Sequence, residues 1–299
     1  MMKIHNDQLH SDEDLVRGLL EAQFPQWSSL PITAVPTSGT ESAIYRLGNE
    51  MVVRMPYLPS RDDQLEKLFH WLPAIGPRLP LPIPEPIGRG LPTEEFPAAW
   101  SIIRWLPGEE VTLEGLADPV DAARTLANFV RVLTSIDPTG GPAPGTHNFW
   151  RGVPLSHRDQ ITRQSLNASG KLIDVNQVAR TWERLLCTPE WTGAPCWLHG
   201  DLAPDNMLAT NGQLTAVIDW GGLGIGDPAI ECLPAWNLFR GESRQAYREA
   251  LGFDDATWAR GRGLALSTAI VALPYYIDKI PVRAAHAREI INEVLQEDT

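Results

Sequence analysis

The sequence predicts an α+β protein of two lobes, with an antiparallel sheet in the N-terminal lobe and mainly helices in the C-terminal lobe. Up to about residue 106, short apolar runs alternate with turn residues, which is typical of neighbouring strands in one sheet. Beyond that point apolar residues recur mostly at helical spacing. A length of 299 residues is long for one hydrophobic core and suits two. We therefore expect lobes over residues 1–106 and 107–299.

The N-terminal lobe is expected to begin with a helix opened by Ser11 and Asp14. A meander of three strands should follow, over residues 32–36, 43–47 and 51–55. Ser60 is placed to cap a second helix, whose apolar side would carry Leu65, Leu68, Phe69 and Leu72. Seven prolines between residues 73 and 92 indicate an extended crossing segment, and a last strand is expected over residues 99–105.

The C-terminal lobe is expected to hold six helices and two short strands. A proline- and glycine-rich loop over residues 137–144 follows the first helix. The strands fall at residues 196–198 and 214–218, and the helices at residues 118–136, 175–187, 229–239, 242–251, 256–276 and 281–296.

Composition excludes several classes of partner. The net charge is −12, whereas a nucleic-acid binder needs a basic face. The N-terminus has no apolar core of a signal peptide, and the longest apolar stretch, residues 264–277, is too short to span a bilayer. Three scattered cysteines, Cys187, Cys196 and Cys232, are typical of reduced thiols. We expect a cytoplasmic protein with no nucleic-acid or membrane partner, and the oligomeric state is not readable.

Two clusters carry the chemistry. An apolar strand runs into a loop that bears Asp201 and, five residues later, Asn206. A second apolar strand ends at Asp219, and a hairpin with Asn211 and Gly212 as its turn should bring Asn206 and Asp219 near one another. Phosphoryl transfer needs hard oxygen ligands for Mg²⁺ and a separate carboxylate for the attacking hydroxyl. Asp201 fits the role of base, and Asn206 with Asp219 fits that of metal ligands.

At these residues the sequence resembles the aminoglycoside phosphotransferase family, antibiotic kinases with a protein-kinase-like fold. His-Gly-Asp-x4-Asn at 199–206 is similar to the family's catalytic loop, and Ile-Asp-Trp-Gly at 218–221 to its metal motif. Gly-Asp-Pro at 226–228, with Glu231 beyond it, matches the segment that follows. The resemblance implies a nucleotide-dependent O-phosphotransferase that uses Mg²⁺ and ATP or GTP, with residues 1–106 binding nucleotide and residues 107–299 carrying catalysis and the acceptor.

The resemblance also implies nucleotide contacts in the N-terminal lobe. They come from the loop over the phosphates, from the position where protein kinases place a lysine, and from the inter-lobe hinge: Ser38, Gly39, Thr40, Arg54, Arg104, Trp105 and Leu106. The sequence departs from the family at Leu68, where a glutamate is common, and Glu66 is the nearest carboxylate that could pair with Arg54. His199 is expected to be structural, and Asp227 to act as a cap.

Several alternatives stay open. The acceptor is expected to be an aminoglycoside or a macrolide, and a non-antibiotic metabolite is the alternative. Local carboxylates favour a cationic acceptor, namely Asp201, Asp205, Asp227 and Glu231. Aromatic residues favour a bulky apolar one, namely Trp236, Phe239, Trp258, Tyr275 and Tyr276. A catalytically impaired nucleotide-binding regulator and a metal-dependent phosphohydrolase are the other classes, the latter disfavoured because the seven histidines show no metal-binding spacing.

Overall fold

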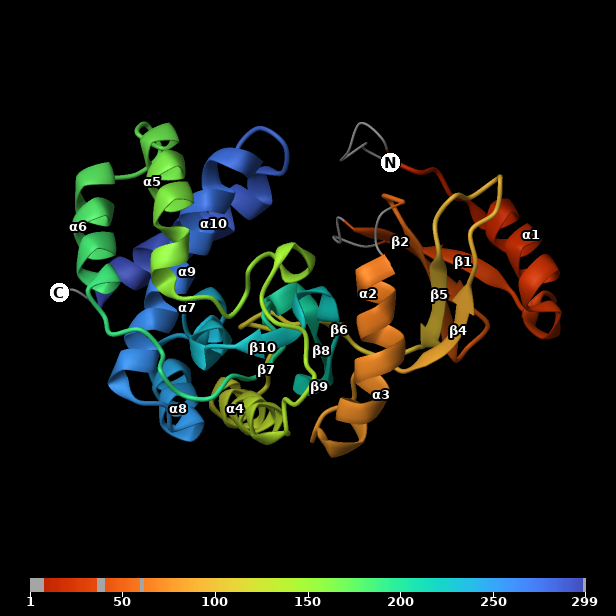
Figure 1. The fold of residues 1–299 in the computed structure, drawn as a ribbon, viewed down its shortest axis with the longest axis horizontal. Coiled ribbons are helices and arrows are strands. Elements are labelled where there is room, and N and C mark those ends of the chain that lie inside the picture. Colours follow the sequence, from red (N-terminus) through yellow and green to blue (C-terminus); the bar gives the residue numbers. More distant parts are fainter. Residues whose placement is uncertain (1–7, 37–40, 60–61, 298–299) are drawn as a thin grey trace. The chain divides into compact units, whose positions relative to one another are not determined.

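A computed structural model describes residues 8–36, 41–59 and 62–297. The chain divides into two compact units (Figure 1). The first comprises Met1–Gly108 together with the short segment Ala216–Trp220, and the second comprises Glu109–Thr215 and Gly221–Thr299. The sequence did not indicate that a segment so late in the chain packs with the first unit.

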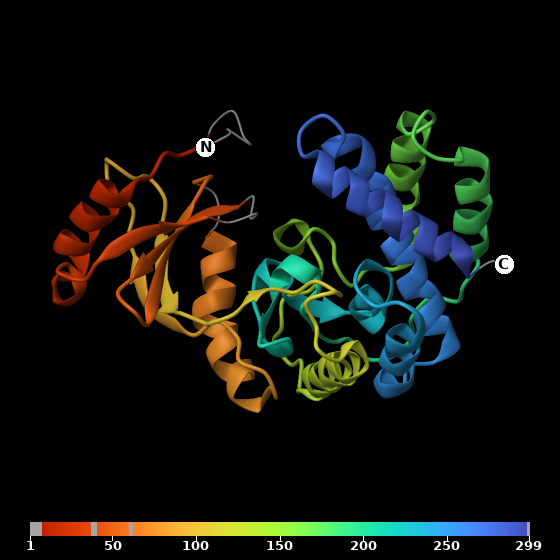
Figure 2. The same cartoon turned by 180° about the vertical axis from the view of Figure 1, so that it is seen from behind.

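The first unit is built on a five-stranded antiparallel sheet with strand order β1-β2-β3-β5-β4. The helix α1 (Glu13–Gln23), capped by Asp12, covers one face, and the helical segment that begins at α2 lies on the other (Figures 1 and 2). The core beneath α1 includes Val16, Leu20 and Trp100. The strands are β1 (Ile32–Val35), β2 (Ser42–Leu47), β3 (Met51–Pro56), β4 (Pro86–Gly90) and β5 (Trp100–Arg104).

The prediction that residues 73–92 form an extended crossing segment without helix is wrong for the first part of this range. Pro73 is the second residue of α3 (Leu72–Ile75), near the end of a helical segment. Its ring and missing N–H coincide with an irregular, π-helical turn just before it. A 3-10 turn, η3 (Gly76–Arg78), follows. Pro86 then opens β4, an edge strand, and proline is tolerated at a sheet edge because one side of that strand needs no ladder hydrogen bonds.

The second helix of this unit is continuous but irregular. It starts as α2 (Asp62–Glu66), passes through a π-helical turn, η2 (Lys67–Trp71), and ends as α3. Its expected apolar side is buried at Leu65, Leu68 and Leu72, whereas Phe69 is half-buried. The expected cap, Ser60, lies outside the described residues.

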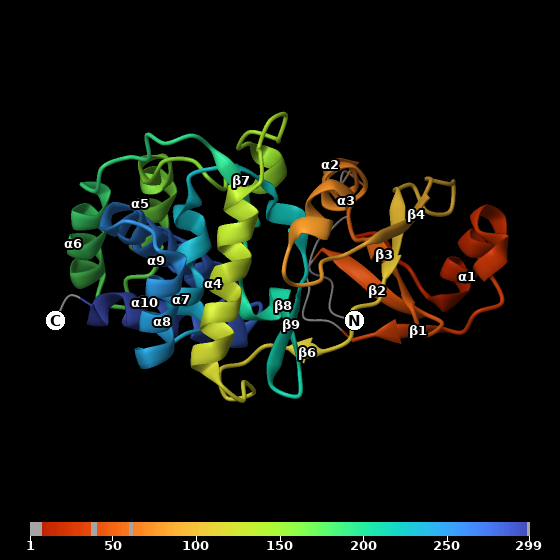
Figure 3. The same cartoon turned by 90° about the horizontal axis from the view of Figure 1, so that it is seen from below.

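Helices dominate the second unit, as predicted, and the fold class is thereby confirmed. The long helix α9 (Asp255–Tyr276) contacts α5 (Asp159–Ala168), α6 (Val175–Leu186) and α10 (Pro281–Gln296), while α4 (Pro119–Ser135) packs on α8 (Gly241–Leu251) (Figure 3). The sequence missed α5, because Thr162 and Leu166 are its only buried residues and too few to show periodicity.

The single helix expected over residues 229–239 is also wrong. A 3-10 segment, η8 (Pro228–Cys232), precedes the short helix α7 (Pro234–Asn237). Pro234 explains the break, since its ring and missing N–H prevent a helix from continuing into that residue.

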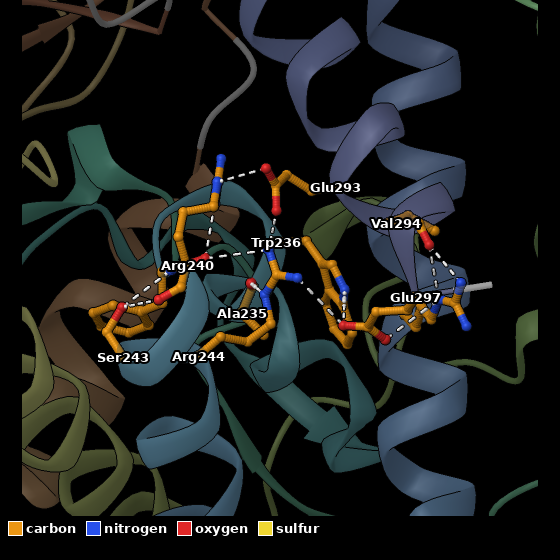
Figure 4. A network of polar contacts seen from close by, with 10 residues as sticks. Ala235, Trp236, Arg240, Ser243, Arg244, Glu293, Val294 and Glu297 are labelled. Atoms are coloured by element: carbon orange, nitrogen blue, oxygen red, sulfur yellow. Dashed lines mark hydrogen bonds and ion pairs between the residues drawn. The ribbon is translucent and has the colours of Figure 1, made fainter. Parts of the chain in front are cut away.

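Polar contacts tie the end of α10 to α7 and α8 (Figure 4). Arg244 pairs with Glu293 and Arg240 lies 3.1 Å from the same carboxylate. The Trp236 indole donates to Glu297 over 3.0 Å. These contacts hold the last helix against the body of the second unit.

Two small sheets carry the chemistry-bearing loops. One has the order β6-β8-β9, formed by β6 (Glu109–Glu110), β8 (Met207–Thr210) and β9 (Gln213–Val217); the other pairs β7 (Cys196–Leu198) with β10 (Gly224–Gly226). The predicted hairpin between β8 and β9 is confirmed. Its turn residues, Asn211 and Gly212, have φ angles of 53° and 74°, as a two-residue hairpin turn requires. Within the described part of the chain, no helix is long and apolar enough to cross a membrane.

Candidate active site

The loop after β7 places Asp201 and Asn206 against one another. The Asn206 amide nitrogen donates to the main-chain carbonyl of Asp201 over 2.9 Å and lies 3.5 Å from Asp201 Oδ2. The Asp201 N–H donates to His199 Nδ1 over 3.2 Å. Because the His199 ring is fully buried and braces the loop from within, its expected structural role agrees with its position.

The backbone of this loop is closely packed. Gly200 has φ +80°, and a Cβ there would lie 2.7 Å from the carbonyl oxygen of Gly222. Only glycine combines that backbone conformation with so close an approach. The carboxylate of Asp201 is therefore presented by a loop with little room to move.

A buried carboxylate lies beneath the loop. Glu231 Oε1 accepts the Gly200 N–H over 2.8 Å, whereas Oε2 is buried and makes no hydrogen bond with the described residues. Burial raises the pKa of Glu231 to about 7; hydrogen bonds from the loop backbone oppose this shift, and the Asp201 charge adds to it. The sequence pointed to Glu231 only through its motif, and the structure shows it bonded to the loop.

The side-chain amide of Asn206 uses its nitrogen for contacts within the loop. Since its nitrogen donates to Asp201, its oxygen is left for another ligand. Asp219 follows the far end of the same hairpin and has the uncommon φ of 58°. Among the described residues no three His, Cys, Asp or Glu side chains form a metal-binding group. Amide and carboxylate oxygens are hard ligands of the kind that Mg²⁺ binds, so the chemistry of these two side chains suits that ion.

Sequence reasoning missed Arg151, which holds the Asp201 carboxylate. The Arg151 Nη2 donates to Asp201 Oδ1 over 3.0 Å. The Asp201 side chain is 43% exposed, so the carboxylate is open on another side. No signal in the sequence places Arg151 here, because the two residues are separated by fifty positions that include two helices.

Asp227 is a structural anchor, as expected of a cap. Its Oδ1 accepts the Ala229 N–H over 3.0 Å, and Arg260 donates to both carboxylate oxygens at 2.7 and 3.2 Å. Both side chains are almost fully buried. A buried carboxylate committed to an arginine and a helix start has no capacity left for a substrate.

Asp205 is also committed. Arg283 Nη2 donates to Asp205 Oδ2 over 3.1 Å, and its guanidinium lies 5.6 Å from the centre of the Tyr276 ring. Tyr275, beside Tyr276, is 48% exposed. The expected apolar pocket is only partly available, because three of its aromatic residues are buried core: Trp236, Phe239 and Trp258.

In the first unit, Arg54 lies on β3 between Val53 and Met55, whose side chains belong to the core beneath α1. Side chains alternate along a strand, so Arg54 is on the opposite face, beside its cross-strand neighbours Ile44 and Ser101. None of the described residues forms an ion pair with Arg54.

Glu66, the carboxylate that the sequence suggests as a partner for Arg54, forms an ion pair with another residue. Its Oε1 lies 2.9 Å from Arg89 Nη1. Among the described residues, the ion-pair partner of Glu66 is therefore this arginine of β4 and not Arg54.

The expected hinge begins at the last residue of β5 and continues beyond the end of that strand. The Arg104 side chain is in an exposed ion pair with Glu85 at 2.6 Å, and this contact lowers the pKa of Glu85. The Trp105 N–H donates to the carbonyl of Glu50 over 2.7 Å, and the Arg46 guanidinium lies 4.0 Å from the centre of its ring. The Arg104 guanidinium is thus engaged with a carboxylate, and Leu106 is half-buried. Ser38, Gly39 and Thr40 lie outside the described residues.

Comparisons with known proteins identify the family and the fold of the chain. The family model described as the phosphotransferase enzyme family, APH, matches residues 32–264. The GDP complex of wild-type aminoglycoside 2′-phosphotransferase-IIIa superposes with a TM-score of 0.74 at 16% identity, over 97% of this chain and 100% of that one. The apoenzyme of macrolide 2′-phosphotransferase MphH from Brachybacterium faecium gives 0.59 at 20% identity, over 94% and 97%. No curated protein matches the chain. Structural likeness at such low identity establishes the fold.

Proposed function

The chain belongs to the phosphotransferase enzyme family, and on this premise we propose that it is a Mg²⁺-dependent kinase of an antibiotic hydroxyl. As a member it is a nucleotide-dependent phosphotransferase that acts on a small molecule. The observation that supports the chemistry is the loop in which Asn206 is bonded to Asp201, with the Asp201 carboxylate open to solvent. The phosphoryl donor is ATP or GTP.

Each residue of the proposed site has a separate task. Asp201 orients the acceptor hydroxyl and takes its proton as the oxygen attacks the γ-phosphorus. Asn206 and Asp219 hold Mg²⁺, which when bound neutralises phosphate charge. Arg54 contacts the phosphates, because it is a cation without an ion-pair partner among the described residues on the face opposite α1.

Further nucleotide contacts are proposed in two places. One is the segment Ser38-Gly39-Thr40, which the family resemblance assigns to phosphate binding. At the hinge, Arg104, Trp105 and Leu106 face the base. Because the Arg104 side chain pairs with Glu85, a contact from this residue would come from its main chain.

The carboxylates around the loop favour an acceptor of low charge. Asp205 and Asp227 each have an arginine partner, at 3.1 and 2.7 Å, and Asp201 has Arg151. A polycationic aminoglycoside would have to displace those arginines, and each exchange forfeits an existing ion pair. A bulky, weakly charged acceptor of the macrolide kind has no such cost. It can use the exposed ring of Tyr275, so we favour it over an aminoglycoside.

A coupled assay that detects nucleoside diphosphate tests the proposal. ATP and GTP are each supplied, with and without Mg²⁺, together with aminoglycosides, macrolides or common hydroxylated metabolites. We expect Mg²⁺-dependent transfer to a macrolide that exceeds transfer to aminoglycosides. Efficient transfer to a metabolite alone would reject the antibiotic acceptor. The absence of any turnover would reject the kinase and leave a nucleotide-binding regulator.

The assignment of Asp201 is tested by Asp201→Asn. The variant should fold and bind nucleotide as the wild type does, while kcat falls at least about 10²-fold, because the amide cannot take the proton. Nucleotide affinity, measured by calorimetry, is the control. Wild-type turnover in the variant would contradict the role.

A further inference from the structure

Arg151 approaches the catalytic loop in a way that the motif does not describe. Its Nη2 lies 3.0 Å from Asp201 Oδ1, whereas among the described residues Oδ2 has only the long contact of 3.5 Å with the Asn206 amide. The stem of Arg151 packs over Gly200, where a Cβ would lie 3.2 Å from its Cβ and Cγ atoms. One carboxylate oxygen is thus fixed and the other is left for a further donor.

The segment that carries Arg151 has an unusual backbone. Phe149 and Trp150 both have positive φ angles, of 54° and 58°. Such a conformation is strained for a residue other than glycine. The Phe149 side chain is half exposed, and the Trp150 ring packs only on one side, with its centre 4.9 Å from that of His157. Two consecutive residues with positive φ angles therefore destabilise this segment locally, and other contacts must hold it in place.

Buried hydrogen bonds hold the segment in place. The fully buried Asn148 accepts the Gly145 N–H over 2.9 Å and donates to the carbonyl of Arg151 over 3.1 Å. The carbonyl of Gly152 accepts the Asp227 N–H over 3.0 Å. A Cβ at Gly152 would lie 2.7 Å from the Leu198 side chain, directly before the catalytic loop. The segment is therefore closed on itself before Arg151 and anchored after Arg151 to the strands that support the loop.

Charges of both signs surround Arg151, since the carboxylates of Asp201 and Glu231 and a second arginine all act on it or are acted on by it. Its side chain is only 14% exposed, and its Nε is buried without a partner among the described residues. A second arginine, Arg158, lies close by, where burial and the charge of Arg151 together lower the pKa of Arg158 to about 10. Two neighbouring, largely desolvated cations repel one another, and an anion between or beside them relieves that repulsion. Asp201 is such an anion.

We propose that Arg151 is a positioning residue that fixes the Asp201 carboxylate for proton transfer. The proposal rests on the proposed function, in which Asp201 is the base. The acceptor O–H proton passes to Asp201 Oδ2 while the hydroxyl oxygen forms its bond to the γ-phosphorus. The bond from that phosphorus to the β,γ-bridging oxygen breaks, and nucleoside diphosphate leaves with its electron pair. Arg151 stays on Oδ1 throughout and keeps Oδ2 aimed at the hydroxyl.

The test compares Arg151→Met and Arg151→Lys in the full chain. Methionine keeps the length of the stem without the charge, so kcat should fall roughly 10- to 100-fold, the cost of a misplaced base, while nucleotide affinity stays within about twofold. Lysine supplies the charge without the planar fork and should recover part of the loss. Arg163→Met is the matched control, because Arg163 is an exposed arginine of α5 paired with Asp159 at 2.8 Å. It should leave kcat unchanged.

A double-mutant cycle separates positioning from a structural role. If Arg151 acts through Asp201, adding Arg151→Met to Asp201→Asn should cost less than about threefold, because the group being positioned is already gone. Additive losses, or a kcat for Arg151→Met within about threefold of wild type, would overturn the proposal. A wild-type protein that neither transfers phosphoryl groups nor hydrolyses nucleotide would instead reject the proposed function, and the inference with it.

Discussion

Single residues decide how the nucleotide phosphates would be held. Arg54 lies on the face of the sheet opposite α1, and Glu66, the expected partner, pairs with Arg89 instead. A guanidinium without an ion-pair partner among the described residues is available to a phosphate, and such a charge-assisted contact is worth about 1.5–3 kcal/mol.

Arg54→Ala should therefore raise the nucleotide KM by roughly tenfold or more, since 1.4 kcal/mol corresponds to a factor of ten. Arg54→Lys should have a smaller effect, because the charge is kept. Arg89→Ala, which removes an exposed arginine of the same sheet, is the control and should leave the nucleotide KM unchanged. Steady-state kinetics with varied nucleotide and saturating acceptor measure all three. An effect confined to the acceptor KM would remove Arg54 from the phosphate site.

The sequence predicts residues that act together within one short motif and misses partners that come from far along the chain. Asp201 and Asn206 are five residues apart, and their contact follows from the loop between them. The arginines beside the acidic residues are 50 positions away for Arg151 and 78 for Arg283. Only tertiary packing brings them into place, and no local pattern records which arginine meets which carboxylate.

At the scale of elements, the sequence predicted a strand or hairpin correctly where a specific local signal marks it. It missed elements that have no such signal. The hairpin between β8 and β9 was predicted because Asn211-Gly212 is a specific turn signal. The edge strand β4 was missed because proline is normally evidence against a strand. The sequence also did not predict the boundary between α2 and α3. The π-helical turn that joins them has no signature in the spacing of apolar residues.

The turn of the hairpin gives a prediction at this scale. A Cβ at Gly212 would lie 2.7 Å from the backbone nitrogen of Ala117 and 2.8 Å from its Cβ, in addition to the strain of a φ of +74°. Gly252 has a similar φ of +66° with nothing within 4 Å. Gly252→Ala should lower the free energy of unfolding by about 1 kcal/mol, the cost of the backbone conformation alone.

Gly212→Ala should cost at least about 1 kcal/mol more, because the chain at Ala117 must move as well. Urea unfolding followed by circular dichroism compares the two variants with the wild type. Equal losses would show that the contact with Ala117 yields easily and that only the backbone strain matters.

At the scale of the whole molecule, stability should depend on pH through Glu231. Burial raises the pKa of this carboxyl from 4.5 to about 7 in the folded protein. Between these two values the folded state binds more protons than the unfolded state, so the free energy of unfolding falls as pH rises. The contribution is complete below about pH 4.5 and is lost by about pH 7, for a total on the order of 3 kcal/mol.

Glu231→Gln removes the ionisation and keeps an oxygen that can accept the Gly200 N–H. The stability of the wild type relative to this variant should fall steadily between pH 4.5 and 7, equivalent to roughly 5–10 °C in Tm, and should be constant above pH 8. Glu242→Gln, at an exposed position in the first turn of α8, is the control and should show a much smaller dependence, because its carboxylate stays in water. Thermal unfolding of the three proteins across this pH range provides the measurement. A wild-type-to-variant difference that does not change with pH would mean that Glu231 is equally ionised in the folded and unfolded chains. The hydrogen bonds from the loop would then offset the effect of burial on its pKa.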